Sequence, residues 1–305
     1  MGVLAANAND PELKKVFAPL FSKSGCFPIC LHLPCIISAM RDYASIKPTE
    51  IVMPRYNIVH FQNPAADKET AFADWQRREL SAKILGLPGV QALRHFGLQP
   101  VQLQPPNPQP YRLASLYELE TDDLASVLKS FTELARNPPK QAGLLAEDVA
   151  HVFELTRPLL ESPHEYDPTA PLNVAFVMGN CIDGMEKEYD AWYDNVHSVE
   201  VLGTPGFFRM RRGVISPLQA DPEDAQPANR LVLLLIRSHD LFLSIEEFIA
   251  RAFGTSKSGI AWGPREAAAS FASLKRTTHV FTPYCPRLIS ETNKPVPATE
   301  TEAQK

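Results

Sequence analysis

The feature that most constrains the fold of this chain is an internal repeat. The segment WQRRELSAKILGLPG, which begins at Trp75, and the segment WYDNVHSVEVLGTPG, which begins at Trp192, agree at six of fifteen positions with an offset of 192 − 75 = 117 residues. A second pair, HVFELTRPLL from His151 and HVFTPYCPRL from His279, agrees at five of ten positions with an offset of 128 residues. Because the two matches occur in the same order, we infer a duplicated module of roughly 110–120 residues.

The second copy predicts alternating strands and helices. Apolar and β-branched runs predict strands over residues 172–178, 207–215, 231–236 and 278–281. Apolar residues at helical spacing predict a helix over 186–202, which Gly203 and Pro205 end. We expect two further helices, one over 244–252 with Ser244 as its N-cap and one from Pro264 to residue 274. The order β-α-β-β-α-β is that of a ferredoxin-like module.

The first copy follows the same order, with strands over 51–61, 90–96, 112–119 and 151–155 and helices over 72–85 and 122–135. The strand LVLLLI, residues 231–236, is apolar on both faces and needs cover on both sides. We therefore predict an α+β fold of two tandem ferredoxin-like modules whose sheets face each other in an intramolecular α/β barrel.

The predicted domain boundaries follow from the repeat. The modules span residues 50–165 and 170–289, residues 1–49 form an N-terminal extension, and residues 290–305 form a disordered tail.

Composition excludes several classes of protein. The formal charge of −5 lacks the basic excess of a nucleic-acid binder. Five cysteines are an odd number, and the spacing of Cys26, Cys30 and Cys35 is not that of a zinc site, so we expect reduced thiols and no bound metal. The sequence has no apolar run of the ~20 residues that cross a membrane and no secretory signal, which predicts a cytoplasmic protein without a membrane partner.

One segment resembles a known superfamily. Residues 188–213, EYDAWYDNVHSVEVLGTPGFFRMRRG, contain a Trp-Tyr pair, acidic residues, a histidine one turn later, a Pro-Gly break and an aromatic residue that starts a strand. These residues are Trp192, Tyr193, Asp194, His197, Pro205, Gly206 and Phe207. The pattern resembles the dimeric α/β-barrel proteins, and most closely the group of EthD-like proteins, polyketide cyclases and cofactor-independent monooxygenases. The resemblance implies the fold, but this fold serves many different reactions.

Members of this superfamily usually dimerise to complete the barrel, so a tandem chain is expected to act as a monomeric pseudo-dimer or to form a homodimer. The two copies have diverged. Leu80, Arg77 and Gln76 occupy the positions of His197, Asp194 and Tyr193. A site that depends on those three residues would exist only in the second copy.

His197 is the first catalytic candidate, because a histidine beside an acidic residue can act as a general acid or base. Asp194, three residues earlier, would orient the imidazole or raise its pKa, and Tyr193 would support it. Tyr189, Trp192, His279 and His60 are the candidates for binding substrate. Structural roles compete with each assignment: His197 can hold a turn, and the aromatic residues can be core packing. Arg209, Arg211 and Arg212, with Arg94, are interpreted as surface charge rather than as an anion site.

The predicted function is that of a cofactor-independent enzyme of specialised metabolism. It would catalyse a cyclase, dehydratase or isomerase reaction on an aromatic or polyketide-like small molecule held in an apolar pocket between the two sheets. The alternatives are a non-catalytic ligand-binding or stress-responsive protein and a cofactor-free monooxygenase. No nucleotide, flavin or metal motif is found in the sequence, so no cofactor is expected. An interior filled by bulky side chains would count against the enzymatic hypothesis.

Overall fold

The structure is a computed structural model that describes residues 53–103, 110–136, 143–224, 226, 228–263, 271–283 and 285–290, with only the backbone described for 271–279. All of these residues lie in the unit that spans residues 51–305. The predicted N-terminal extension, its three cysteines and the predicted tail beyond residue 290 lie outside the described residues.

The first half of the unit contains four long strands and two helical segments. Strand β1 (Arg55–Pro64) is followed by α3 (Glu69–Trp75), the π-helical turn η2 (Gln76–Leu80) and α4 (Ser81–Leu85). Strands β2 (Val90–Leu98) and β3 (Leu113–Glu120), helix α5 (Leu124–Phe131) with the π-helical turn η3 (Thr132–Arg136), and β4 (Leu145–Glu154) complete it.

The second half repeats this order. It contains β6 (Leu172–Cys181), α6 (Glu186–Trp192), η5 (Tyr193–His197), α7 (Ser198–Leu202), β7 (Phe207–Ile215), β8 (Arg230–Arg237), α8 (Leu241–Phe253) and β9 (Phe271–Pro283). Each element of the first half from its first strand to its third strand has a counterpart in the second half 117 residues later. The first strands, for example, begin at Arg55 and at Leu172. Both halves also carry a π-helical turn at the same point of the first helical segment.

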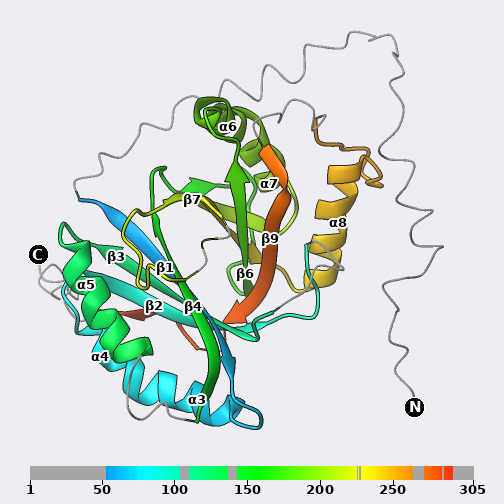
Figure 1. The fold of residues 1–305 in the computed structure, drawn as a ribbon. Helices are drawn as coiled ribbons and strands as arrows, with labels where there is room; N and C mark the ends of the chain where they lie inside the picture. Colours follow the sequence, from blue (N-terminus) through cyan, green and yellow to red (C-terminus); the bar gives the residue numbers. More distant parts are fainter. Residues whose placement is uncertain are drawn as a thin grey trace, which may run out of the picture. The chain divides into compact units, whose positions relative to one another are not determined.

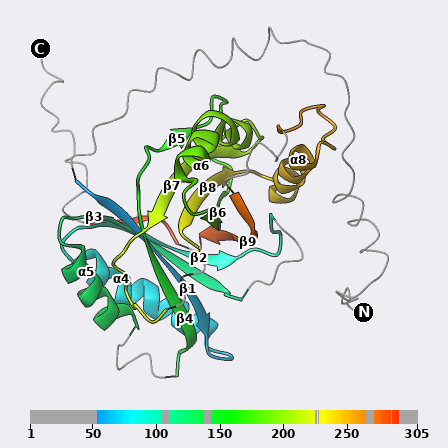
Figure 2. The same cartoon turned by 45° about the horizontal axis from the view of Figure 1, so that its top comes forward.

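All strand pairs of the sheet are antiparallel, and the path of paired strands closes on itself. The order is β2-β3-β1-β4-β7-β8-β6-β9, and β9 pairs again with β2. The two halves meet where β4 pairs with β7 and where β9 pairs with β2. The short strands β5 (Leu160–Glu161) and β10 (Leu288–Ile289) add to β7 and β2. Helices α3, α4 and α5 lie against the strands of the first half, and α6, α7 and α8 lie against those of the second (Figures 1 and 2).

Strand β8 confirms the prediction that both of its faces are covered. Val232, Leu234 and Ile236 pack with the helices of the second half. Leu231 and Leu233 face the other way and pack with side chains from both halves. The sheet therefore separates two helix-covered cores from one shared interior.

The shared interior is filled by phenylalanine side chains. Phe61, Phe96, Phe153, Phe176 and Phe281 are each at most 1% exposed. The ring centroid of Phe176 lies 5.8 Å from that of Phe61, 5.6 Å from that of Phe96 and 5.7 Å from that of Phe281, all in edge-on arrangements. The prediction of an apolar binding pocket between the two sheets is therefore wrong for the part of the interior that these residues occupy, because their aromatic rings fill that space.

Two predicted helices need correction. Helix α8 begins at Leu241 rather than near Ser244, because the side chain of Asp240 accepts a hydrogen bond from the Leu243 backbone N–H at 3.1 Å. Ser244 instead bonds the hydroxyl of Ser238. The helix expected from Pro264 to residue 274 is wrong over 271–274, which belong to β9, and the rest of it lies outside the described residues.

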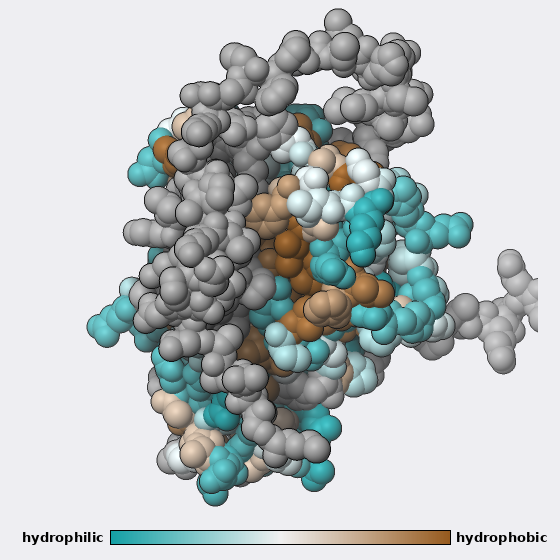
Figure 3. Space-filling view, turned by 90° about the vertical axis from the view of Figure 1, so that its right-hand side faces the viewer, coloured by the Kyte–Doolittle hydropathy of each residue, from teal (hydrophilic) through white to brown (hydrophobic). Residues whose placement is uncertain are grey.

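Helix α8 leaves three large apolar side chains, Phe242, Leu243 and Phe253, more than half exposed. Figure 3 views the molecule from the side on which α8 lies in Figure 1 and shows a hydrophobic area there. At 13 residues, α8 is shorter than the ~20 residues that a membrane span requires. Within the described residues, the structure has no helix that is long and apolar enough to cross a membrane.

The filled interior makes a testable prediction about stability. We expect Phe176→Ala to lower the free energy of unfolding by about 3–5 kcal/mol, because it removes a fully buried ring that touches three others. Phe242→Ala, on the exposed face of α8, is the matched control and should change it by about 0.5 kcal/mol or less. Urea unfolding followed by circular dichroism measures both. Equal stability of the two variants would show that the interior is not a packed core.

Candidate functional site

Five of the predicted site residues lie on one helical segment of the second half. Tyr189 and Trp192 belong to α6, and Tyr193, Asp194 and His197 belong to η5. Tyr189 and Tyr193 are buried against the outer face of β7 and β8, and their ring centroids are 4.9 Å apart. The segment therefore brings these five residues together, but on the helix-covered side of the sheet rather than in the shared interior.

Arg212 of β7 is the central charge of this layer. Its guanidinium lies 4.9 Å from the centroid of the Tyr193 ring, and its Nη2 donates to Oδ1 of Asp194 at 2.7 Å and approaches Asp190 at 3.4 Å. The residue is only 4% exposed. Its Nε and Nη1 have no hydrogen-bond partner among the described residues. A buried guanidinium with two unpaired nitrogen atoms is costly unless an acceptor binds there.

The interpretation of Arg212 as surface charge is therefore wrong. A β-bulge between Phe207 and Arg209 shifts the alternation of β7, so that Met210 and Arg212 face the helices. Arg209 fits the expectation, since it pairs at the surface with Glu161.

A second arginine, Arg230 of β8, lies beside Arg212 under the same helix. Its guanidinium is 5.6 Å from the centroid of the Tyr189 ring, and its Nη1 donates to the Asn229 carbonyl. A cavity of about 10 Å³ lies between Tyr189, Arg212 and Arg230, with Thr156 also in its wall. This volume suits about one water molecule or one oxygen atom of a ligand. Burial, with a further contribution from Tyr193, raises the pKa of Tyr189 well above its ordinary value, so its hydroxyl keeps its proton at neutral pH.

His197 lies at the edge of this layer. Its ring stacks on Trp192 with centroids 4.4 Å apart, and it meets Tyr193 edge-on at 5.0 Å. Nδ1 is 3.3 Å from Oε2 of Glu200, which also accepts the Gly263 backbone N–H through Oε1. Glu200, rather than the predicted Asp194, is thus the carboxylate that orients this imidazole. Asp194 is instead engaged by Arg212 and by Arg157, because the buried guanidinium requires a countercharge.

His60 and His279 are not part of this cluster. The side chain of His60 is fully buried in the first half, where Nε2 lies 2.7 Å from Asp148 Oδ2 and Nδ1 lies 3.1 Å from Gln62 Nε2. Because both ring nitrogens have protein partners, the geometry does not support substrate binding by His60. The backbone of His279 pairs with Phe176 in β9, and its side chain is outside the described residues.

A buried polar network that the sequence did not predict surrounds His60. Its other members, each at most 2% exposed, are Gln62, Gln76, Ser81, His95 and Ser115. Gln76 donates to Gln62 at 2.9 Å, and the two ring nitrogens of His95 lie 2.9 Å from Ser81 Oγ and 2.7 Å from Ser115 Oγ. The polar residues at 60 and 62, which share one face of an otherwise apolar strand, are the signal that could have found it. A network whose groups bond one another rigidifies a core.

This network continues to a contact between the halves. Asp148 also accepts from Nε of Arg136 at 2.9 Å, and Nη1 of Arg136 donates to Asp224 at 2.7 Å. Asp224 follows β7, in the second half. Burial alone would raise the pKa of Asp148, but the hydrogen bond and charge of His60, together with Arg136, lower it overall. Arg136 thus joins Asp148 of the first half to Asp224 of the second half through ion pairs.

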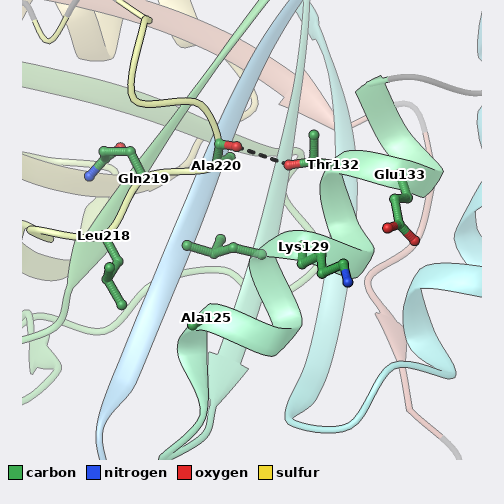
Figure 4. A pocket seen from close by; sticks show the side chains of 8 residues that line it. Ala125, Lys129, Thr132, Glu133, Leu218, Gln219 and Ala220 are labelled. Carbon is green, nitrogen blue, oxygen red and sulfur yellow. Dashed lines mark hydrogen bonds between the residues drawn. The ribbon is translucent and has the colours of Figure 1, made fainter.

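A larger surface groove lies elsewhere, between α5 with η3 and the loop at residues 218–220 (Figure 4). Its volume is about 410 Å³, and the Thr132 hydroxyl donates to the Ala220 carbonyl across it at 3.0 Å. It contains none of the predicted site residues. In the described part of the chain, no group of three or more His, Cys, Asp or Glu side chains is placed to hold a metal ion.

Comparisons with known proteins extend the description of the fold. No protein-family model and no curated protein matches the sequence. Among solved structures, an anthrone oxidase-like protein matches with a TM-score of 0.51 and 12% identity over 78% of this chain and 94% of that one. A candidate monooxygenase from Fusobacterium nucleatum matches with a TM-score of 0.48 and 12% identity over 78% of this chain and 94% of that one. A chlorite dismutase from Candidatus Nitrospira defluvii matches with a TM-score of 0.44 and 10% identity over 77% of this chain and 93% of that one. At 12% identity the first similarity shows a shared α+β fold alone, and the resemblance to the dimeric α/β-barrel superfamily and its EthD-like group stays a prediction.

The buried network makes a prediction about pH. Burial lowers the pKa of His95 to about 3, whereas an unfolded histidine titrates near 6.5. Below about pH 6 the unfolded chain binds a proton that the folded chain does not, so stability falls by up to about 1.4 kcal/mol per pH unit.

Urea unfolding between pH 7 and pH 4 should show this loss in the wild type and a shallower slope in His95→Gln. His239→Gln, which replaces an exposed histidine, is the control and should keep the wild-type slope. An unchanged slope in His95→Gln would contradict the assignment of a neutral His95.

Proposed function

We propose that the chain is a small-molecule enzyme whose site lies between the segment α6–η5–α7 and the outer face of β7 and β8. The observation that carries the proposal is Arg212, a buried arginine whose Nε and Nη1 have no acceptor among the described residues and which adjoins a cavity the size of one oxygen atom. A site of this kind suits a substrate that develops negative charge on oxygen. Because side chains fill the interior, we place the proposed site in this layer rather than in the space between the sheets.

The proposed chemistry begins with proton removal from an enolisable aromatic or polyketide-like substrate. His197, oriented by Glu200, would act as the base, and the enolate oxygen would accept hydrogen bonds from Arg212. Tyr193 lies between these two residues, at 5.0 Å from the His197 ring and 4.9 Å from the Arg212 guanidinium. Asp194 positions Arg212, Tyr189 lines the cavity beside Arg212, and Trp192 supplies aromatic surface for the substrate. The cavity accepts the oxygen, and the ring system would lie toward solvent.

Two reaction types share this first step. In a cyclase, dehydratase or isomerase reaction, the enolate attacks, eliminates or is reprotonated within the same molecule. In a cofactor-free oxygenation, a ring CH₂ group and O₂ give C=O and water, so that O₂ is the oxidant and one of its atoms enters the product. The name of the anthrone oxidase-like structure supports an anthrone as the first probe.

We further infer that the chain is a tandem duplication, with modules at residues 50–165 and 170–289 that act as a pseudo-dimer. The recurrence of six consecutive elements after 117 residues supports this inference. A homodimer of the whole chain remains the alternative assembly.

A non-catalytic ligand-binding protein is the second candidate function. The filled interior and the small volume beside Arg212 count against turnover of an aromatic substrate, which normally needs a larger pocket, and leave room there for only a small ligand group. The two functions differ in whether turnover exists.

The test combines a turnover assay with paired variants. We expect oxygen uptake or a new product, followed by an oxygen electrode and mass spectrometry, when the full chain is given an anthrone or a linear polyketide mimic. Arg212→Met should lower kcat/KM by about 10²-fold or more, because it removes the oxyanion donors. His197→Asn should lower it by about 10²-fold through loss of the base.

Matched controls are Arg209→Met, on the same strand but at the surface, and His239→Asn, both of which should keep wild-type turnover. Circular dichroism checks that each variant folds. Turnover that survives Arg212→Met would place the site elsewhere. Absence of turnover with every probe would favour the non-catalytic function.

A further inference from the structure

One end of the shared interior is charged rather than apolar. Asn57 of β1 stands opposite Glu118 of β3 and opposite Phe153 of β4. Directly opposed residues of an antiparallel pair lie on the same face of the sheet. Since Phe153 belongs to the phenylalanine-filled interior, Asn57 and Glu118 also face the interior.

Three arginines converge on this single glutamate. Arg287 donates to both carboxylate oxygens of Glu118, at 2.7 and 3.0 Å, and Arg211 Nη1 lies 3.8 Å from it. Arg94 stands opposite Leu116, which packs against the interior cluster, so Arg94 shares that face. We call Asn57, Arg94, Glu118, Arg211 and Arg287 the interior charged end. Its formal charge is 3 − 1 = +2.

The charges that border the interior charged end do not cancel this excess. Arg55 pairs with Glu120 at 3.0 Å, and Arg209 pairs with Glu161 at 2.7 Å, so each of these pairs is neutral. Arg237, which lies near Arg94, adds a further positive charge and donates to the Ala170 carbonyl. Burial lowers the pKa values of Arg94 and Arg211, and neighbouring arginines lower them further while Glu118 opposes this shift.

Two buried groups at this end have unused hydrogen-bonding capacity. Within the described residues, Nε of Arg94 has no hydrogen-bond partner. Asn57 is 1% exposed, and neither its Nδ2 nor its Oδ1 is bonded in the part of the chain that the structure describes. Buried polar groups are nearly always paired, so these two donors, Asn57 Nδ2 and Arg94 Nε, which have no partner among the described residues, indicate a missing acceptor.

We propose that the interior charged end binds a small oxyanion, a carboxylate or a phosphate group. Arg94 and Arg211 supply the charge, since guanidinium groups match the geometry of both anions. Asn57 Nδ2 supplies a neutral donor. Arg211 and Arg287 keep 25% and 38% of their side-chain surface exposed, so solvent reaches the site.

This site is separate from the one proposed for catalysis and does not depend on it. Arg211 and Arg212 are neighbours on β7, and their side chains lie on opposite faces of the sheet. Arg211 faces the interior beside Glu118, and Arg212 faces helix α6 beside Tyr193. One strand thus contributes a cation to each site.

The experiment titrates the full chain with inorganic phosphate and, separately, with acetate, at an ionic strength held constant with chloride. Isothermal calorimetry and the rise in Tm measure binding. We expect saturable binding of at least one probe. Preference for phosphate or for acetate tells which anion class the site takes.

Variants decide whether binding occurs at the proposed residues. Arg94→Met should weaken binding about tenfold or more. Asn57→Leu should weaken binding and at the same time preserve or raise the free energy of unfolding, because an apolar side chain of similar size replaces an unpaired amide. Arg78→Met, at an exposed position on η2, is the control and should bind as the wild type does.

In Asn57→Leu we expect weaker anion binding together with an unchanged or higher free energy of unfolding, and a purely structural role of Asn57 would not give this combination. This variant decides the question if Arg94→Met does not fold. The proposal is overturned if neither probe binds saturably, if Arg94→Met binds as the wild type does, or if Asn57→Leu destabilises the fold without weakening binding.

Discussion

The packing of aromatic rings between the two sheets is the interaction on which the rest of this structure depends. Phe61, Phe96 and Phe153 come from the first half, and Phe176 and Phe281 from the second, so neither half can bury its inner face alone. The same packing determines where chemistry can occur. Because the rings occupy the middle of the interior, the two sites that we propose lie on a helix-covered face and at the charged end of the interior.

The two helix-covered faces have equivalent backbones and different chemistry. Positions 76 and 95 of the first half correspond to positions 193 and 212 of the second by the offset of 117 residues. The first pair is glutamine and histidine in a mutually bonded network. The second is tyrosine and arginine, and Nε and Nη1 of the arginine have no hydrogen-bond partner among the described residues. Satisfied groups stabilise a core, whereas unsatisfied ones are available to a ligand. This contrast supports assigning the catalytic proposal to the second half.

Much of the fold could be predicted from the sequence, because the repeat and the spacing of apolar residues are local signals. The strand at 231–236, which is apolar on both faces, correctly predicted that both of its faces are covered. What fills the interior could not be predicted, since Phe61 and Phe281 are far apart in the chain and a pattern shows which way a residue faces but not what it meets. The face of Arg212 was missed for another reason. A bulge at 207–209 reverses the alternation, and period-two patterns carry no sign of it.

The closure of the strand path has a consequence for synthesis on the ribosome. One edge of β2 pairs with residues 281–283 of β9, although β2 itself ends at residue 98. The partner is therefore made 283 − 98 = 185 residues later, which at ~5–20 residues per second is a delay of roughly 10–40 s. During that interval, the nascent first half offers an open sheet edge and a row of aromatic side chains to any other chain nearby. We therefore expect the chain to bind chaperones while it is being translated.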